Sequence, residues 1–143
     1  MFSAARLRHV WLRRARAVEA MILLLLAKSL IRAVPLHRWR ATLGRIGDPV
    51  SQLPGPAHRT ISRSVADAAR KLPGEYVCLP RAMAVQWMLR RRGLASAIVF
   101  GVAPPQTGGK PYALHAWVEV GGHIIIGDDP TINYARGLML VQP

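Results

Sequence analysis

Apolar residues recur at helical spacing through the first half of the chain. Residues 15–33 predict a helix, because apolar side chains return every three or four positions, at Val18, Met21, Ile22, Leu25, Leu26 and Leu30. The same spacing predicts a shorter helix over residues 36–46. A third helix is predicted over residues 58–72, with an apolar stripe of Ile61, Val65, Ala68, Ala69 and Leu72. A loop rich in proline and glycine, residues 47–56, separates the second helix from the third.

The strongest helix candidate is residues 79–92. Pro80 falls in its first turn, where proline is tolerated, and Gly93 provides a stop after an arginine-rich last turn. Apolar side chains surround most of this helix, so we expect it to lie in the centre of the fold. Cys78 then occupies the N-cap or the first helical position.

Beyond residue 93 the period changes from helical to alternating. Residues 97–102, 112–120 and 123–127 predict strands, with a final short strand around residues 138–141 and an exposed loop over residues 104–111. Gly121-Gly122 is a two-residue hairpin signal. Helices followed by an antiparallel sheet indicate an α+β fold. We expect one domain over residues 1–143, mainly helical in 1–72 and with the last helix and the sheet in 73–143.

The chain is strongly basic, and its charge is unevenly distributed. The net charge is +13, and residues 1–60 carry eleven of the Lys and Arg residues against Glu19 and Asp48. Such a field favours polyanions, acidic peptides or anionic lipid surfaces, although solvated arginines on helix faces are an equally good explanation. No nucleic-acid-binding motif accompanies the charge, which disfavours nucleic acid as a partner.

The apolar run of residues 20–27 is too short to span a membrane, which needs about 20 apolar residues. No small-residue cleavage site follows it, so it is not a typical signal peptide either. We expect a buried core helix here, with peripheral contact at a membrane surface as the alternative.

A single cysteine excludes an internal disulfide and any multi-cysteine metal site. It fits a reducing, cytoplasmic location. No metal-ligand spacing is present, so neither a metal nor a cofactor is expected. Cys78 could be a structural cysteine, but a helix N-terminus lowers a thiol pKa and makes the thiolate, the nucleophilic form, more accessible.

The Gly-Gly turn supplies an independent argument. In a two-residue hairpin Val120 faces His123, and counting outward places His115 opposite Asp128 on the same sheet face. Asp128 would then orient the imidazole of His115. A shift of one residue would bring Asp129 opposite His115 instead, and a surface His–Asp pair without catalytic meaning is a further alternative.

Trp117 and Glu119 follow His115 on the same predicted strand. Trp117 shares the face of His115 and could shield a thiolate–imidazole pair, although ordinary core packing explains it as well. Glu119 is expected to be a solvated strand residue, not an acid catalyst.

Several blocks of this sequence resemble one family. The stretch CLPRA at residues 78–82, the helix end LRRRG at 89–93 and HAWVE at 115–119 are similar to the transglutaminase-like proteases of lasso peptide biosynthesis. These are the leader peptidases, or B proteins, of that pathway. The resemblance extends more weakly to the first helix and residues 36–39. It implies a papain/transglutaminase-like fold in which a nucleophile at a helix N-terminus packs against an antiparallel sheet.

The resemblance further implies a Cys-His-Asp triad, carried here by Cys78, His115 and Asp128, with Asp129 as a competing third member. The implied activity is a cysteine endopeptidase that removes the leader from a ribosomally made precursor peptide. In that family, the freed amine is then closed into a macrolactam by a separate ATP-dependent cyclase. No strand-rich recognition domain is visible in residues 1–72, so the chain resembles the stand-alone form, and a separate leader-recognition protein is an expected partner.

Two other functions are compatible with the same observations. A transamidase would form the same thioester and pass it to an amine. A non-catalytic basic module would bind a peptide, a partner enzyme or a membrane.

Overall fold

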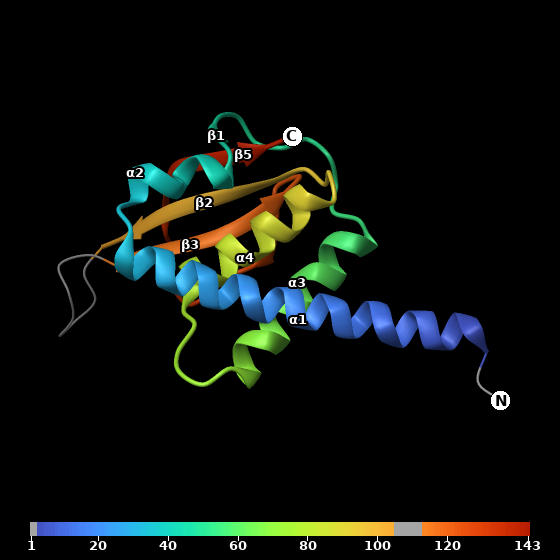
Figure 1. Cartoon of the computed structure of the whole chain (residues 1–143). Coiled ribbons are helices and arrows are strands. Elements are labelled where there is room, and N and C mark those ends of the chain that lie inside the picture. The colour runs from blue at the N-terminus through green and yellow to red at the C-terminus, as the bar shows by residue number, and fades with distance from the viewer. Residues whose placement is uncertain (1–2, 105–112) are drawn as a thin grey trace.

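The computed structural model describes residues 3–104 and 113–143 and confirms the α+β fold (Figure 1). The expected loop at 104–111 lies, beyond Pro104, outside the described residues. The elements in chain order are α1 (Ala4–Ala33), α2 (Leu36–Trp39), the 3-10 helix η1 (Arg40–Leu43), β1 (Arg45–Ile46), α3 (Pro56–Lys71), α4 (Cys78–Arg91), β2 (Ser96–Ala103), β3 (Ala113–Val120), β4 (His123–Ile126) and β5 (Ala135–Gln142).

The described strands form one antiparallel sheet in the order β1-β5-β2-β3-β4. Helix α4 packs on this sheet against β2 and β3, and α1 and α3 both contact α4 (Figure 1). The core therefore has a sheet layer and a helical layer, and α4 lies between the sheet and the other two helices.

Helix α4 is the most buried element. Its residues from Pro80 to Leu89 are buried except for Arg81, which confirms its expected central position. It ends where the sequence predicts, because Gly93 adopts a left-handed φ of 64° that the glycine tolerates. A buried, regular helix fixes the position of its first residue, Cys78.

A buried amide network connects α4 to η1 and to strands β2 and β5. The Gln86 side-chain amide donates hydrogen bonds to the carbonyls of Leu43 (2.7 Å) and Leu140 (3.2 Å), and its oxygen accepts one from Ser96 (2.6 Å). The Gln142 side chain in turn donates to the Gln86 carbonyl (2.8 Å). Since Gln86 is fully buried, these bonds replace water for groups that would otherwise be unsatisfied.

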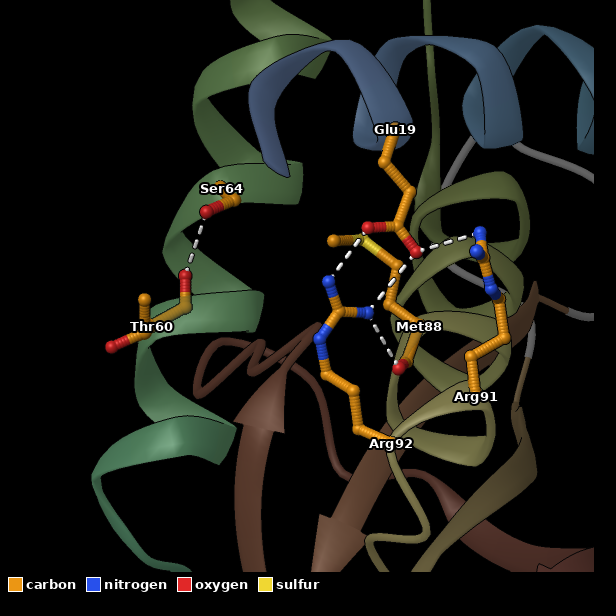
Figure 2. A network of polar contacts seen from close by, with 6 residues as sticks. All are labelled: Glu19, Thr60, Ser64, Met88, Arg91 and Arg92. Carbon is orange, nitrogen blue, oxygen red and sulfur yellow. Dashed lines mark hydrogen bonds and ion pairs between the residues drawn. The ribbon is translucent and has the colours of Figure 1, made fainter. Parts of the chain in front are cut away.

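A charged contact joins α1 to the C-terminal end of α4. Glu19 accepts hydrogen bonds from Arg92 (2.7 and 3.0 Å) and Arg91 (3.0 Å) (Figure 2). The hydrogen bond from Arg92 is the main cause that lowers the pKa of Glu19, against the opposing effect of its partial burial. The only acidic residue of α1 is thus paired with two arginines at the end of α4.

Three predictions about element boundaries were wrong. Helix α1 starts at Ala4 and not at residue 15, with Ser3 as its N-cap. The predicted helix over 36–46 is one short helix, one 3-10 turn and strand β1, because Gly44 at a φ of 126° lies so close to Val141 that no Cβ would fit. The last strand is longer than predicted.

The predicted apolar face of α1 was only partly right. Ala20, Leu24 and Ala27 are fully buried against the core, and Met21 and Leu30 of the predicted face pack partly buried against it. Val18, Ile22 and Leu25 of that face are instead exposed on the opposite side of the helix. Helices α3 and α4 both contact the buried side of α1. Within residues 3–104 and 113–143, no helix combines the length and hydropathy needed to cross a membrane.

We expect Gln86→Met to destabilise the fold by about 1–3 kcal/mol, because it keeps the volume but removes the hydrogen bonds of Gln86 to the Leu43 and Leu140 carbonyls and to the Ser96 hydroxyl. Urea unfolding followed by circular dichroism measures this loss. Arg70→Ala, which removes an exposed ion pair with Asp67, is the matched control and should change stability by at most about 0.5 kcal/mol. Equal stability of the two variants would contradict the role assigned to the network.

Candidate active site

Cys78 is the first residue of α4 and is half-buried at the edge of the core. The residue before it, Val77, caps the helix with no side-chain hydrogen bond, so the first backbone N–H groups of α4 are not used by a capping side chain. These N–H groups and the helix dipole place partial positive charge beside the sulfur, an environment that favours a thiolate.

His115 lies on β3 with its ring half-buried. Its Nε2 is 2.6 Å from the carbonyl oxygen of Gly127, and only a protonated nitrogen can donate to a carbonyl. In the neutral ring Nδ1 is then the unprotonated nitrogen and can accept a proton. The ring also stacks on Tyr134, with centroids 4.8 Å apart, and lies 5.8 Å from the ring of Trp117.

The hairpin register agrees with the prediction for two pairs and then departs from it. Val120 faces His123 and Glu119 faces Ile124 as counted, but Val118 faces Ile126 instead of Ile125. Ile125 is the extra residue of a β-bulge, and its carbonyl accepts a hydrogen bond from Ser62 of α3. Continuing the shifted count places Asp129, and not Asp128, opposite His115.

The two aspartates have different surroundings. Asp128 is exposed, and its carboxylate makes no hydrogen bond or ion pair with other described residues. Asp129 is half-buried and accepts hydrogen bonds from the Thr131 hydroxyl (2.5 Å) and backbone (3.1 Å) and from Tyr134 (3.4 Å). The bonds from Thr131, then that from Tyr134 and the charge of His115, hold the pKa of Asp129 below its usual range.

Tyr134 connects the parts of this site. Burial raises the pKa of its phenol most, followed by the charge and hydrogen bond of Asp129 and then the negative charge of the Cys78 thiolate. Tyr134 thus contacts the ring of His115 and the carboxylate of Asp129, and its phenol interacts electrostatically with Cys78. In the described part of the chain, no hydrogen bond joins the Cys78 thiol to the His115 imidazole. Such bonds are often long in substrate-free enzymes and shorten in the reactive complex.

Residues 21–138 match the family model of the transglutaminase-like superfamily. The chain belongs to this superfamily. No curated protein and no solved structure matches it. Proteins of this superfamily are typically cysteine-type enzymes. The position of the Cys78 thiol at the start of a buried helix agrees with this.

An ion pair between the buried Glu119 and the exposed Arg136 lies beside His115 in this transglutaminase-like domain. Glu119, next but one after Trp117 on the same face of β3, accepts a hydrogen bond from the Trp117 indole (2.7 Å) and two from Arg136 (2.5 and 2.8 Å). Glu119 is 4% exposed, so the expectation of a solvated residue was wrong. Trp117 is held in place by this pair, and its ring lies over Gly101, where an added Cβ would clash at 2.5 Å.

Tyr134 and Arg136 were not predicted from the sequence. Both lie at the start of β5 or just before it, in a segment whose pattern was difficult to interpret. A signal was nevertheless present, because an isolated glycine within a strand, here Gly101, often marks the close approach of another group. Across residues 3–104 and 113–143, no cluster of three or more His, Cys, Asp or Glu side chains could hold a metal ion.

We expect Glu119→Gln to reduce the acid sensitivity of the fold. Burial alone would raise the pKa of Glu119, but the hydrogen bonds from Arg136 and Trp117 and the charge of Arg136 together lower it below 4.5. A lowered folded-state pKa stabilises the fold above the unfolded pKa, and that stability is lost as the pH falls through the folded pKa. Urea unfolding at neutral pH and below pH 4 (roughly the carboxyl range) should show a smaller acid loss in the variant than in wild type.

The matched control is Asp67→Asn, which removes an exposed carboxylate on α3. Its acid loss should equal that of wild type. If Glu119→Gln shows the full wild-type acid loss, the ion pair does not contribute as argued.

Proposed function

We propose that this protein is a cysteine endopeptidase in which Cys78 is the nucleophile and His115 the general base. The observation that carries the proposal is the position of Cys78 at the uncapped N-terminus of the buried helix α4, within a transglutaminase-like domain. The stacking of Tyr134 on His115, together with the small effect of the Cys78 charge on the pKa of the Tyr134 phenol, supports the proximity of the two.

The reaction follows from the protonation of the imidazole. Nδ1 of His115 accepts the thiol proton while Nε2 stays bonded to Gly127, and the thiolate attacks the carbonyl carbon of the scissile amide. Backbone N–H groups at the start of α4, including that of Cys78, are the proposed donors to the resulting oxyanion. The imidazolium then returns its proton to the leaving amine, and a water deprotonated by His115 hydrolyses the thioester.

An aspartate completes the site in this proposal. Asp128 is the position implied by the family resemblance, and Asp129 is the one opposite His115 once the β-bulge is counted. Either carboxylate would stabilise the imidazolium that forms during proton transfer.

For the substrate, we propose the leader–core junction of a ribosomally made lasso precursor peptide. The support is the resemblance of residues 78–82, 89–93 and 115–119 to the leader peptidases of that pathway. In this proposal a separate protein captures the leader and an ATP-dependent cyclase closes the released core.

We expect Cys78→Ala and His115→Gln each to lower precursor cleavage at least about a thousandfold, because both remove a group that takes part in bond making. Mass spectrometry of the precursor, incubated with the protease with and without the leader-binding partner, measures this. His123→Gln, on the exposed tip of the same hairpin, is the matched control and should cleave at the wild-type rate. Full activity of Cys78→Ala would exclude the enzymatic function.

The same spectra separate hydrolysis from transamidation. Hydrolysis leaves a leader with a free carboxylate, whereas a transamidase leaves a leader joined to the added amine. Amide products in place of the free acid would favour the transamidase.

A paired substitution distinguishes the two aspartates. We expect Asp129→Asn to lower kcat by roughly tenfold or more and Asp128→Asn to leave it within about twofold, because Asp129 is closer in register and its charge interacts with His115. Each variant serves as the control of the other in steady-state cleavage assays. The reverse ranking would assign the third position to Asp128.

A further inference from the structure

The outward face of α1 carries a row of exposed apolar side chains. Trp11, Val18, Ile22 and Leu25 are separated by seven, four and three residues, so they lie along one line of the helix. They are between 48% and 69% exposed, although the opposite side of the helix is packed against the body of the fold. Monomeric proteins rarely leave a large contiguous apolar surface in water, so this row, the α1 stripe, indicates a contact surface.

The start of α1 is exposed on all sides. Residues 4–14 are all exposed, and Figure 1 shows this end of the helix extending beyond the rest of the molecule. The apolar side chains here are Leu7, Val10, Trp11 and Leu12. At 3.6 residues per turn they cover about 200° of the helix circumference. One packed helix of a partner protein covers a narrower stripe, roughly 100° wide, whereas a lipid surface can cover the broader arc.

The charge around the α1 stripe is positive. Arg8, Arg14 and Arg32 border the stripe along the helix, and the only acidic residue of α1, Glu19, is held by Arg91 and Arg92 (Figure 2). Anionic headgroups complement this arrangement, since basic residues beside an apolar face are typical of helices that lie in a membrane interface. A second copy would bring the same arginines together in a chain of net charge +13, which opposes self-association.

A hollow lies on this face and is almost entirely apolar. Its volume is about 460 Å³, and its lining includes Trp11, Val18 and Ile22, with Arg14 and the Glu19–Arg91 ion pair also among the lining residues. An apolar hollow of this kind matches the acyl chains of a phospholipid.

We propose that α1 binds the surface of an anionic lipid bilayer. The helix lies in the plane of the interface with the α1 stripe among the outer acyl carbons and its arginines at the headgroups. This binding does not depend on the catalytic proposal, and Cys78→Ala should bind membranes as wild type does.

Flotation with vesicles tests the proposal. We expect the protein to float with phosphatidylcholine vesicles that contain phosphatidylglycerol and to bind pure phosphatidylcholine vesicles at least about tenfold more weakly. Tryptophan fluorescence gives a second readout, because Trp39, Trp87 and Trp117 are buried and Trp11 is exposed. Brominated acyl chains should therefore quench Trp11 selectively.

The decisive variant is Ile22→Gln/Leu25→Gln, which changes two exposed side chains and should leave the unfolding midpoint unchanged. It should bind the anionic vesicles at least about tenfold more weakly than wild type, because it removes apolar area that enters the interface. Leu53→Gln, at an exposed apolar residue outside α1, is the matched control and should bind like wild type.

Three results would overturn the proposal. The first is failure to float with anionic vesicles, and the second is equal binding by the double variant and by Leu53→Gln. The third is a dimer, or a complex with the precursor peptide, that the double variant abolishes while vesicle binding stays unchanged. That outcome would assign the α1 stripe to a protein partner.

Discussion

The structure depends on the burial of α4 between the sheet and the helices α1 and α3. Most of its residues from Pro80 to Leu89 are inaccessible to water, so the helix cannot shift or fray without exposing the core. Gln86 gives the position its specificity, because its amide must meet carbonyls from two other elements. The thiol of Cys78 gains from this rigidity, since a group at the first residue of a fixed helix is held in one place.

The candidate site is formed by three segments that are distant in sequence. The start of α4 supplies the thiol, β3 supplies the imidazole, and the residues between β4 and β5 supply Asp129 and Tyr134. A β-bulge at Ile125 and the ion pair of Glu119 with Arg136 align these segments. The geometry of the site thus depends on the far end of the hairpin as much as on the reacting residues.

Helix α1 has one side buried against the core and one side exposed to solvent. Ala20, Leu24 and Ala27 pack against the core, and Trp11, Val18, Ile22 and Leu25 remain exposed on the opposite side, beside basic residues. The family match begins at residue 21, so the projecting start of α1 lies outside the region shared with the superfamily model. A transglutaminase-like domain and a helix with exposed apolar and basic side chains are therefore present in one short chain.

Local sequence determined the elements whose signals are local. The helix after Cys78, its stop at Gly93 and the Gly-Gly turn follow from residue preferences and spacing, and so does the α+β order of the fold. The face that α1 buries, the register beyond Glu119 and the partners of Glu119 were decided only in the folded chain. Helical spacing identifies an apolar face but not what covers it, and a bulge inserts one residue without any local sequence signal. The positions of Cys78 at a helix start and of His115 on a strand could be predicted because they depend on local sequence. Which aspartate lies opposite His115 depends instead on the β-bulge at Ile125, whose carbonyl accepts a hydrogen bond from Ser62 of α3.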